Sequence, residues 1–430
     1  MKIAFATLGC KVNQFETQAL ELCAKERGHE VVSFSEKAEI YVINTCSVTA
    51  VSDKKSRQLI RKTVRREPCA LIAVCGCFAQ LKPDEASAIE GVDVVSGTGD
   101  KLQFFEMIER AFKEKKKLKS VDKALSRREF EILPAGGLMH HTRAMLKVQD
   151  GCVNFCSYCI IPYARGPVRS MPFEAAVNEA RRLKDEGYQE IVITGIEISS
   201  YGIDLNSKRK IEELISAICE AVPHVRIRLG SLEPRTVTEE FCDTLKKYKN
   251  LCPQFHLSLQ SGCDATLMRM KRKYDTERYI KSVNMLKEAF PNCAITTDLI
   301  VGFPGEDERE FSQTLAFIKK CGFAMMHIFP YSKREGTPAA TMENQVLNAE
   351  KEARAARAAT VAQEMNAEYL AAQIGRKCSV LFEECIDGMW QGHAENYILI
   401  RVQTQNNMKN KIAEVEITEA EKDRLIGILI

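Results

Sequence analysis

The chain has 430 residues, of which 45% are hydrophobic and 28% are charged, and its formal net charge is +3. It is long enough for two or three domains, and no apolar run reaches about 18 residues, so we expect no membrane-spanning helix. Seventeen scattered cysteines, an odd number, argue against a secreted disulfide framework and indicate reduced thiols in a cytoplasmic protein, while the small net charge does not by itself indicate a nucleic-acid partner.

Residues 1–115 are expected to form an open α/β domain. The expected strands and helices alternate, with strands at residues 2–8, 39–44, 70–74 and 92–95 and helices at residues 15–27 and 53–66. The first strand is patterned too promptly for a signal peptide, and Asp53 is the expected cap of the second helix. Short apolar strands that alternate with helices indicate a parallel sheet covered on both faces.

Three cysteines in this domain each follow a strand. Cys10 follows the first strand, Cys46 the second and Cys77 the third. Ligands bind outside the carboxyl ends of strands in open parallel sheets, so we expect these thiols to converge and to hold an iron–sulfur cluster with one open iron. A single cysteine is more often a buried apolar residue than a ligand, and Cys75 is an alternative to Cys77 as the third ligand.

The second helix of this domain carries a basic face. Lys54, Arg57, Arg61 and Arg65 are spaced by three or four residues and therefore share that face. Such a face either contacts an RNA backbone or is simply solvated. More positive charge follows in residues 116–138, which we expect to be a basic linker to the next domain.

A loop at the start of the next domain contains three cysteines within eight positions. Cys152, Cys156 and Cys159 are spaced so that one tight turn can bring their sulfurs to a single metal centre. Zinc would need a fourth ligand, and none follows in residues 160–166, so a zinc site or a chance group of buried thiols is the weaker alternative. Three thiolates suit a [4Fe–4S] cluster in which the fourth iron stays open to an added ligand.

Residues 139–370 repeat the alternation of strand and helix. The expected strands lie at residues 146–150, 191–194, 225–229, 255–259, 294–301 and 326–330. Six such units predict a partial (β/α)6 barrel with its active site at the carboxyl ends of the strands, where the cysteine loop also lies. Gly195, Ser231, Glu233 and Gln260 follow strands at the same rim, and we expect them to contact the amino acid and ribose parts of a cofactor, although such residues also occur in ordinary turns.

The last part of the chain has a different pattern. A long helix over residues 344–372 leaves the barrel, and residues 373–430 are expected to form a small antiparallel β-barrel. Its four expected strands lie at residues 378–382, 397–402, 412–417 and 425–430. Barrels of this kind commonly bind nucleic acid, and Trp390 and Tyr397 are the expected RNA contacts. The alternative is a domain that only stabilises the protein or its dimer.

The cysteine loop resembles that of the radical S-adenosylmethionine (SAM) enzymes, including the aromatic Tyr158 before the last cysteine. The whole chain resembles a radical SAM methylthiotransferase in residues 8–13 (LGCKVN), 44–46 (NTC) and 76–80 (GCFAQ), and its last part is similar to a TRAM domain, an RNA-binding β-barrel. The branch that modifies N6-threonylcarbamoyladenosine in tRNA is the most similar, in residues 11–13, 44–49, 161–166 and 228–234. Cys75 and residues 196–200 depart from the family pattern.

This resemblance implies two [4Fe–4S] clusters, one at each set of three cysteines, and SAM as both radical source and methyl donor, with Tyr158 among the residues that bind it. The implied reaction places a methylthio group on C2 of N6-threonylcarbamoyladenosine next to the anticodon, and no catalytic acid or base is expected. The implied partners are tRNA and a flavodoxin- or ferredoxin-like reductant, while the sulfur donor and the oligomeric state stay open.

Three alternatives remain at the level of the sequence. The first is methylthiolation of isopentenyladenosine, the substrate of a sister branch. The second is a radical SAM methylase or isomerase in which the N-terminal cysteines are inert. The third is an iron–sulfur protein that binds RNA or senses redox state and has no such activity.

Overall fold

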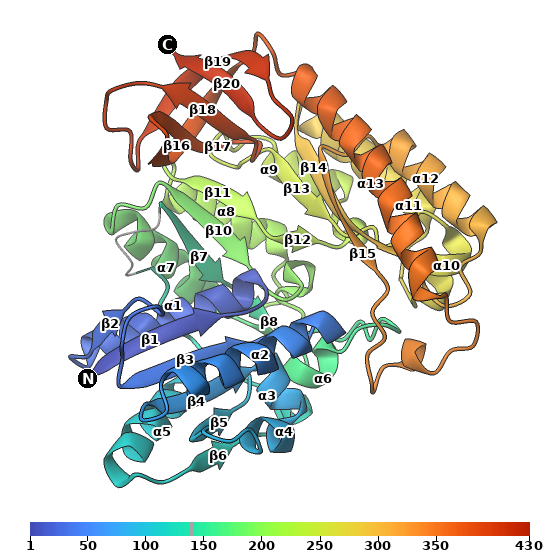
Figure 1. The fold of residues 1–430 in the computed structure, drawn as a ribbon. Coiled ribbons are helices and arrows are strands. Elements are labelled where there is room, and N and C mark those ends of the chain that lie inside the picture. Colours follow the sequence, from blue (N-terminus) through green and yellow to red (C-terminus); the bar gives the residue numbers. More distant parts are fainter. Residues whose placement is uncertain (137–141) are drawn as a thin grey trace.

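The computed structural model describes residues 1–136 and 142–430 and arranges them in three parts (Figure 1). An N-terminal α/β domain lies at one end, a partial barrel lies in the middle, and a small β-barrel lies at the opposite end. This is the α/β architecture that the sequence predicts. The expected boundary between residues 138 and 139 lies outside the described residues.

The N-terminal domain is built on a six-stranded parallel sheet with the order β2-β1-β3-β4-β5-β6. Its strands are β1 (Lys2–Thr7), β2 (Glu30–Val32), β3 (Ile40–Thr45), β4 (Leu71–Gly76), β5 (Val94–Ser96) and β6 (Leu118–Ser120). The central strands β3 and β4 are buried along their whole length, as expected for apolar runs covered on both faces. The sheet extends past residue 115, so residues 118–120 of the expected linker are a strand of this domain.

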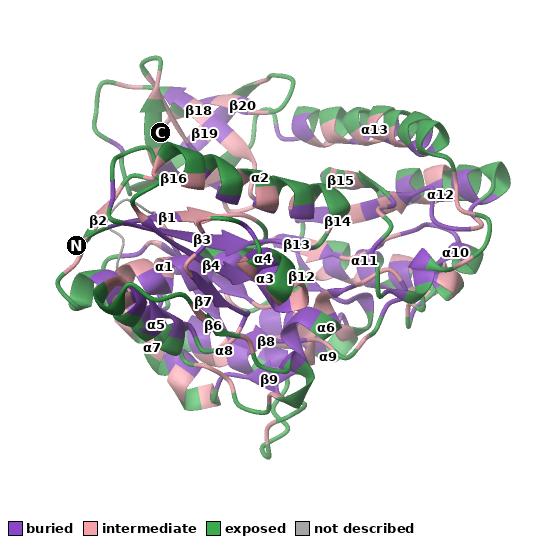
Figure 2. Cartoon of the chain, turned by 60° about the horizontal axis from the view of Figure 1, so that its bottom comes forward, coloured by how far each residue is buried: buried purple, intermediate pink, exposed green. Residues whose placement is uncertain are grey.

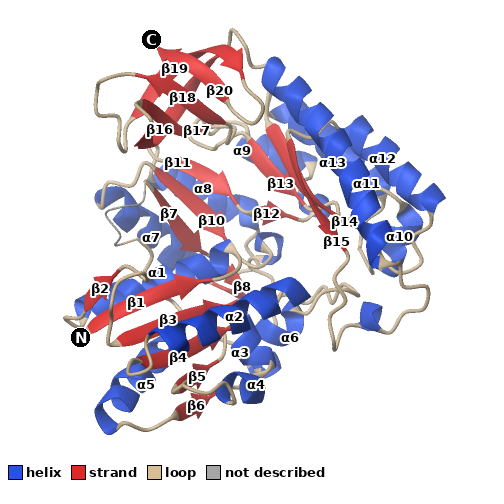
Figure 3. Ribbon diagram, viewed as in Figure 1, coloured by secondary structure: helices blue, strands red, loops and turns tan. Residues whose placement is uncertain are grey.

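Helices cover both faces of this sheet (Figure 3). They are α1 (Lys11–Glu26), α2 (Ala50–Arg66), α3 (Cys77–Leu81), α4 (Pro83–Ser87) and α5 (Lys101–Glu114), and a 3-10 turn, η1 (Ala124–Ser126), follows the sheet. The expectation that Asp53 caps α2 is wrong. The helix begins at Ala50, and the Thr49 side chain accepts the capping hydrogen bond from the backbone N–H of Ser52.

The middle part is a partial barrel of parallel strands in two sheets, β11-β10-β7 and β12-β13-β14-β15. A parallel bridge between Ile227 and Leu251 joins the two sheets, and β8 and β9 form a short antiparallel pair beside the cysteine loop. The strands are β7 (Arg143–Lys147), β8 (Gln149–Asp150), β9 (Arg169–Ser170), β10 (Glu190–Thr194), β11 (Arg226–Leu229), β12 (Ser231–Leu232), β13 (Gln254–Leu257), β14 (Ala294–Val301) and β15 (Met325–Pro330).

Helices pack on the outer side of these strands around one apolar core. They are α7 (Phe173–Asp185), α8 (Ile211–Ala221), α9 (Glu239–Leu245), α10 (Asp264–Arg269), α11 (Thr276–Ala289), α12 (Glu308–Cys321) and α13 (Asn348–Ala371), and the chain also has the 3-10 turns η2 (Ile198–Ser200), η3 (Pro234–Thr236) and η4 (Pro338–Ala340). The short α6 (Ile161–Arg165) lies instead against α3 of the N-terminal domain. No helix in the described part of the chain has both the length and the apolar character that a membrane crossing requires.

The C-terminal part is a closed barrel with the strand order β16-β17-β18-β20-β19. Its strands are β16 (Lys377–Ile386), β17 (Met389–Ala394), β18 (Leu399–Gln403), β19 (Ile412–Ala420) and β20 (Leu425–Leu429). The barrel has five strands where four were expected, because Gln391, Gly392 and His393 interrupt the apolar alternation of β17. It is antiparallel except for the parallel pair of β18 and β20.

This small barrel is docked on the amino ends of the strands of the partial barrel. Arg226 at the start of β11 donates from Nη2 to Ser379 Oγ at 2.8 Å, and Arg228 donates from Nη1 to the Glu395 carbonyl at 2.9 Å. The N-terminal domain is docked by Arg334, which donates to Asp53 at 2.9 Å, with both side chains buried. Arginine side chains of the central part thus hold both flanking domains.

Candidate active site

The first cysteine set lies in the loop that follows β8. This loop turns tightly, because Gly151 has a φ of +75° and the backbone N–H of Cys159 donates to the Cys156 carbonyl at 2.9 Å. A Cβ on residue 151 would lie 1.9 Å from the Pro167 carbonyl oxygen, so glycine is required there. Cys156 is buried, whereas Cys152 and Cys159 are partly exposed.

The sulfurs of this loop lie close enough to perturb one another. Burial raises the pKa of Cys152 to about 11 and that of Cys159 to about 12, and the Cys156 sulfur adds to both shifts. The Arg272 guanidinium donates from Nη1 to Cys156 Sγ at 3.3 Å. Three mutually close thiols without a fourth ligand suit a cluster, in which each thiolate binds a different iron, and metal binding would release the thiol protons.

The second cysteine set lies at the carboxyl ends of β1, β3 and β4, which are neighbours in the N-terminal sheet. Cys10 precedes α1, Cys46 follows β3, and Cys77 is the first residue of α3. Burial raises the pKa of Cys77 to about 12, and Cys10 and Cys46 add to that shift. A Cβ on Gly9, at a φ of +114°, would lie 3.0 Å from Cys46 Sγ, so glycine also lets these loops approach closely.

Cys75 lies apart from this second set. It is fully buried in the apolar cluster that contains Phe104 and Phe105 of α5, on the other face of the sheet. Burial raises the pKa of Cys75 to about 11, with smaller contributions from Lys101 and Glu16 and none from another cysteine. The geometry therefore groups Cys77, and not Cys75, with the other two thiols.

The described residues contain no group of three or more His, Cys, Asp or Glu side chains arranged to hold a single metal ion. A single zinc ion would need its ligands gathered around one point. A four-iron cluster spreads its thiolates over separate irons. The prediction that each cysteine set holds a four-iron cluster stays a prediction at this point.

Arg165 joins the regions that carry the two cysteine sets. Its Nη1 donates to Glu16 at 2.6 Å and to Asp150 at 3.3 Å, and its Nη2 donates to Asn13 Oδ1 at 2.8 Å. The same Asn13 oxygen accepts a weak bond from Cys10 Sγ at 3.7 Å, while Asp150 ends the strand before the cysteine loop. Burial alone would raise the pKa of Glu16, but the Arg165 charge holds it below its ordinary value. The sequence did not indicate this connection.

Glu197 is a further residue of the site that the sequence did not single out. It accepts a hydrogen bond from Ser200 and lies 3.5 Å from Asn154 Nδ2 in the cysteine loop. Its Oε1 is buried and has no hydrogen-bond partner among the described residues, and burial raises its pKa. Glu197 lies in residues 196–200, where the chain departs from the family pattern. That departure was the one sequence feature that could have pointed to Glu197. A free carboxylate oxygen here can accept a hydrogen bond from a group such as an ammonium.

The expected cofactor contacts lie at the carboxyl ends of the barrel strands. Gly195 directly follows β10, and Ser231 is exposed at the start of β12. Gln260 adopts a left-handed φ of +68° after β13, and Tyr158 packs edge-on against Phe303 with ring centroids 6.4 Å apart. These residues share the rim with the cysteine loop, so they stay candidates for binding SAM.

Glu233, the strongest of the expected cofactor contacts, already has partners within the chain. Its carboxylate accepts from the backbone N–H of Arg235 at 3.1 Å and from Arg235 Nε at 3.0 Å. Its own backbone N–H donates to Ser199 Oγ at 2.9 Å. The carboxylate therefore caps the turn η3, and a cofactor would have to share it with that turn.

The expected RNA contacts on α2 differ in their surroundings. Much of α2 is exposed (Figure 2). Lys54, Arg61 and Arg65 are exposed and form no hydrogen bond or ion pair within the part of the chain that the structure describes. Arg57 instead donates to Glu85 at 3.1 Å and lies over the Phe78 ring. Three of the four side chains are therefore free to meet a polyanion.

The expected RNA contacts on the small barrel are both partly buried. Trp390 packs against the core of that barrel. Tyr397 stacks on His393 with ring centroids 4.6 Å apart, and the Arg228 guanidinium lies 4.7 Å from its ring centroid. Tyr397 therefore faces the junction with the central part.

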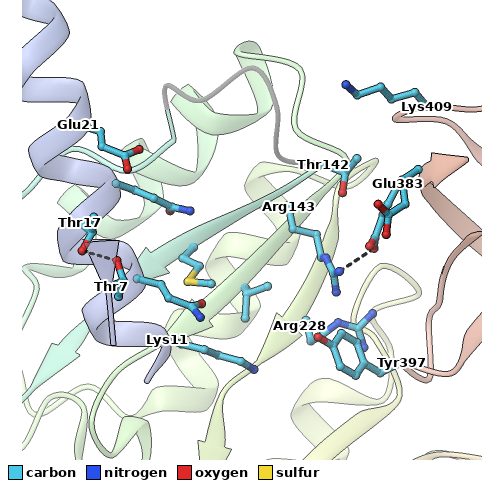
Figure 4. Close-up of a pocket in the computed structure, with 15 residues that line it drawn as sticks. Thr7, Lys11, Thr17, Glu21, Thr142, Arg143, Arg228, Glu383, Tyr397 and Lys409 are labelled. Carbon is cyan, nitrogen blue, oxygen red and sulfur yellow. Dashed lines mark hydrogen bonds and ion pairs between the residues drawn. The ribbon is translucent and has the colours of Figure 1, made fainter. Parts of the chain in front are cut away.

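A cavity of about 840 Å³ opens at this junction (Figure 4). Its walls come from all three parts of the chain: Lys11 from α1, Arg143 from β7, Arg228 from β11 and Tyr397 from the small barrel. The protein around Lys11 and the charges of Arg228 and Arg143 lower the pKa of Lys11. The charged lining of the cavity consists of four cations and three carboxylates: Lys11, Arg143, Arg228, Lys409, Glu21, Glu383 and Glu384.

Comparison with known proteins agrees with this geometry. Residues 146–318 match the model of the radical SAM superfamily, and residues 2–97 match a family described as uncharacterized protein family UPF0004. The solved structure of the radical SAM methyltransferase TsrM from Kitasatospora setae has the same fold, with a TM-score of 0.58 and 14% identity over 79% of this chain and 77% of that chain. The barrel and its cysteine loop thus define a radical SAM enzyme.

Relatives in sequence narrow this class. The chain is 41% identical to threonylcarbamoyladenosine tRNA methylthiotransferase MtaB of Bacillus subtilis, over 97% of this chain and 94% of the relative. It is 36% identical to the protein of that name in Aquifex aeolicus, over 94% of this chain and 100% of the relative. It is 35% identical to tRNA-2-methylthio-N(6)-dimethylallyladenosine synthase of Clostridium tetani, over 79% of this chain and 76% of the relative. The chain belongs to the radical SAM methylthiotransferase family. The predicted enzyme class is confirmed, with SAM and a [4Fe–4S] cluster as its cofactors.

Proposed function

We propose that this enzyme transfers a methylthio group to C2 of N6-threonylcarbamoyladenosine next to the anticodon of tRNA. The observation that carries the proposal is the presence of two separate sets of three thiols, on two domains that Arg165 joins. The substrate is proposed from two relatives of this chain, at 41% and 36% identity, which are named as threonylcarbamoyladenosine tRNA methylthiotransferases. A radical SAM enzyme that only methylates or isomerises would need one set.

The two cysteine sets have separate tasks in this proposal. Cys152, Cys156 and Cys159 would hold the cluster that binds SAM, and Cys10, Cys46 and Cys77 would hold a second [4Fe–4S] cluster. When bound, these groups supply the radical and sulfur chemistry that an unactivated C–H bond requires. The chain itself supplies position, because the domain junction at Arg165 fixes one set relative to the other.

The surroundings of the SAM-binding loop would orient the cofactor. Arg272 holds the Cys156 sulfur, and the free Oε1 of Glu197 would accept a hydrogen bond from the SAM ammonium group. Gly195, Ser231 and Gln260 at the same rim would contact the rest of the molecule. The proposed reaction needs no acid or base from the chain.

Partners follow from the same proposal. The tRNA backbone would lie along Lys54, Arg61 and Arg65 of α2, because these cations have no competing partner among the described residues. Electrons would come from a flavodoxin- or ferredoxin-like protein, and the enzyme would work in the cytoplasm, where tRNA is modified.

Iron and sulfide content after anaerobic reconstitution tests the proposal. The wild type should hold about eight irons per chain, and a Cys152→Ala/Cys156→Ala/Cys159→Ala variant and a Cys10→Ala/Cys46→Ala/Cys77→Ala variant about four each. Nucleoside analysis should then show 2-methylthio-N6-threonylcarbamoyladenosine in tRNA treated with the wild type. About four irons in the wild type, all lost from the first variant, would contradict the proposal. Product on dimethylallyladenosine alone would assign the other substrate.

A further inference from the structure

Two cations near Tyr397, in the cavity at the junction of the three parts, have free donors. Lys11 extends from the start of α1 toward Arg228 and Tyr397 (Figure 4), and its ammonium group forms no hydrogen bond or ion pair with the residues that the structure describes. Arg143 donates from Nη2 to Glu383 at 2.6 Å, which leaves Nε and Nη1 without an acceptor among those residues. Both side chains can therefore donate to a guest in the cavity.

Arg228, the third arginine or lysine near the Tyr397 ring, is fixed by its own partners. Arg228 donates from Nε and Nη2 to Glu190 at 2.7 and 2.9 Å and from Nη1 to the Glu395 carbonyl. The Tyr397 ring lies against this guanidinium and against that of Arg143, with its centroid 4.7 and 5.2 Å away. Arg228 and Arg143 are consequently each paired with a carboxylate, whereas Lys11 has no ion pair among the described residues. Glu21, Glu384 and Lys409 complete the charged lining of the cavity.

The cavity also lies beside one of the cysteine sets. Lys11 directly follows Cys10 at the start of α1, so the backbone segment that positions Lys11 also carries one of the thiols proposed to hold the second cluster. The substrate adenosine must approach the same thiols for sulfur transfer. The cavity is therefore placed to receive a substituent of that adenosine.

We propose that Lys11 and Arg143 bind the carboxylate of the threonylcarbamoyl substituent and so select N6-threonylcarbamoyladenosine over adenosines with a neutral N6 substituent. This inference rests on the proposed function. The threonylcarbamoyl group ends in a carboxylate and carries a hydroxyl, whereas a dimethylallyl group has no charge and no hydrogen-bonding atom. The threonylcarbamoyl carboxylate can accept charge-assisted hydrogen bonds from an ammonium and a guanidinium group, whereas a dimethylallyl group can accept none. Binding an apolar substituent would also remove water from these two cations without replacing its hydrogen bonds.

Binding measured without turnover tests this inference. The reconstituted enzyme, with no reductant, is titrated with anticodon stem–loop RNAs that carry N6-threonylcarbamoyladenosine, its methyl ester, or unmodified adenosine. The wild type should bind the acid about tenfold or more tightly than the ester. Lys11→Gln and Arg143→Gln should weaken binding of the acid toward that of the ester and leave the ester unchanged, while Lys11→Arg should keep most of the preference.

The matched control is Lys25→Gln, which removes the same charge from an exposed position near the other end of α1. It should bind both RNAs as the wild type does, and iron content should be equal in all variants. Equal affinity of the wild type for acid and ester would overturn the inference. Equal weakening of both RNAs by Lys11→Gln would also overturn it, because Lys11 would then bind a backbone phosphate, which the ester retains. Failure of the proposed function is separate, since it would appear as missing methylthio product.

Discussion

Arg165 in α6 donates a 2.6 Å hydrogen bond to Glu16 in α1, and both side chains are completely buried at the junction of two domains. A buried guanidinium is stable only with its charge compensated, and here Glu16, Asp150 and Asn13 surround it. The loops that carry the two cysteine sets both end near this group. Arg165 thus links the two domains that carry the cysteine sets, together with the buried cations Lys147 and Arg169, which pair with the same carboxylates.

Replacing Arg165 should therefore disturb both centres. Arg165→Met removes the cation nearest to Glu16 and leaves Lys101, Lys147 and Arg169 as the remaining partners of Glu16 and Asp150. We therefore expect a loss at the lower end of about 3–5 kcal/mol in the free energy of unfolding and reduced iron at both sites. Differential scanning calorimetry and iron analysis measure the two effects. The control is Arg57→Met, which breaks a more exposed pair with Glu85 and should cost at most about 1 kcal/mol. Equal effects of the two changes would refute this role of Arg165.

The two neighbouring cysteines of β4 and α3 should behave differently. Cys77→Ser should remove the second cluster, lowering iron by about four per chain, because Cys77 lies with Cys10 and Cys46. Cys75→Ser should keep that iron, because Cys75 is buried on the opposite face of the sheet. Iron analysis and electron paramagnetic resonance after reduction distinguish the variants. Loss of iron in Cys75→Ser alone would reverse the assignment.

Acid should weaken the junction through Glu16. The charge of Arg165 holds the pKa of Glu16 low although burial opposes this, so Glu16 stabilises the fold above its unfolded pKa of about 4.3. That stability is lost as the pH falls from there through the lower folded value. The thermal midpoint of metal-free protein should fall over this range, and the dependence should be shallower in Glu16→Gln. Parallel curves for the two proteins would show that another group controls acid unfolding.

The basic face of α2 should bind RNA through three of its four cations. Arg61→Gln and Arg65→Gln should each lower tRNA affinity regardless of sequence and reduce the slope of log affinity against log salt by about 0.7 to 0.9. Arg57→Gln should change the slope less, because Arg57 is already held by Glu85. Filter binding at several salt concentrations gives these slopes. A slope that none of the variants changes would mean that α2 is only a solvated face.

Much of this architecture could be predicted because buried parallel strands leave a clear pattern. The apolar runs of β3 and β4 and the cysteines after them indicated where the thiols would meet, although Cys75 could not be separated from Cys77 without the register of the sheet. The strand β17 was missed because Gly392 and its polar neighbours hide its alternation.

Contacts between distant parts of the chain could not be predicted in the same way. Arg165 and Glu16 are 149 positions apart, and nothing local marks an arginine whose partners lie on another domain. The cavity around Lys11 depends on the docking of three parts, and Tyr397, expected on an RNA-binding surface, instead faces that cavity. Spacing along the chain carries no information about such docking.

The docking of the small barrel has a consequence for how this terminal domain works. Arg226 and Arg228 anchor the small barrel, and the small barrel supplies Tyr397 and Glu383 to the cavity. The small barrel is therefore a fixed part of the cavity wall and not a domain on a flexible tether. Removing the small barrel would leave the cavity open on one side and would remove Glu383, the ion-pair partner of Arg143. Any gain or loss of RNA binding in a shortened chain would therefore reflect the opened cavity as much as a missing RNA-binding surface.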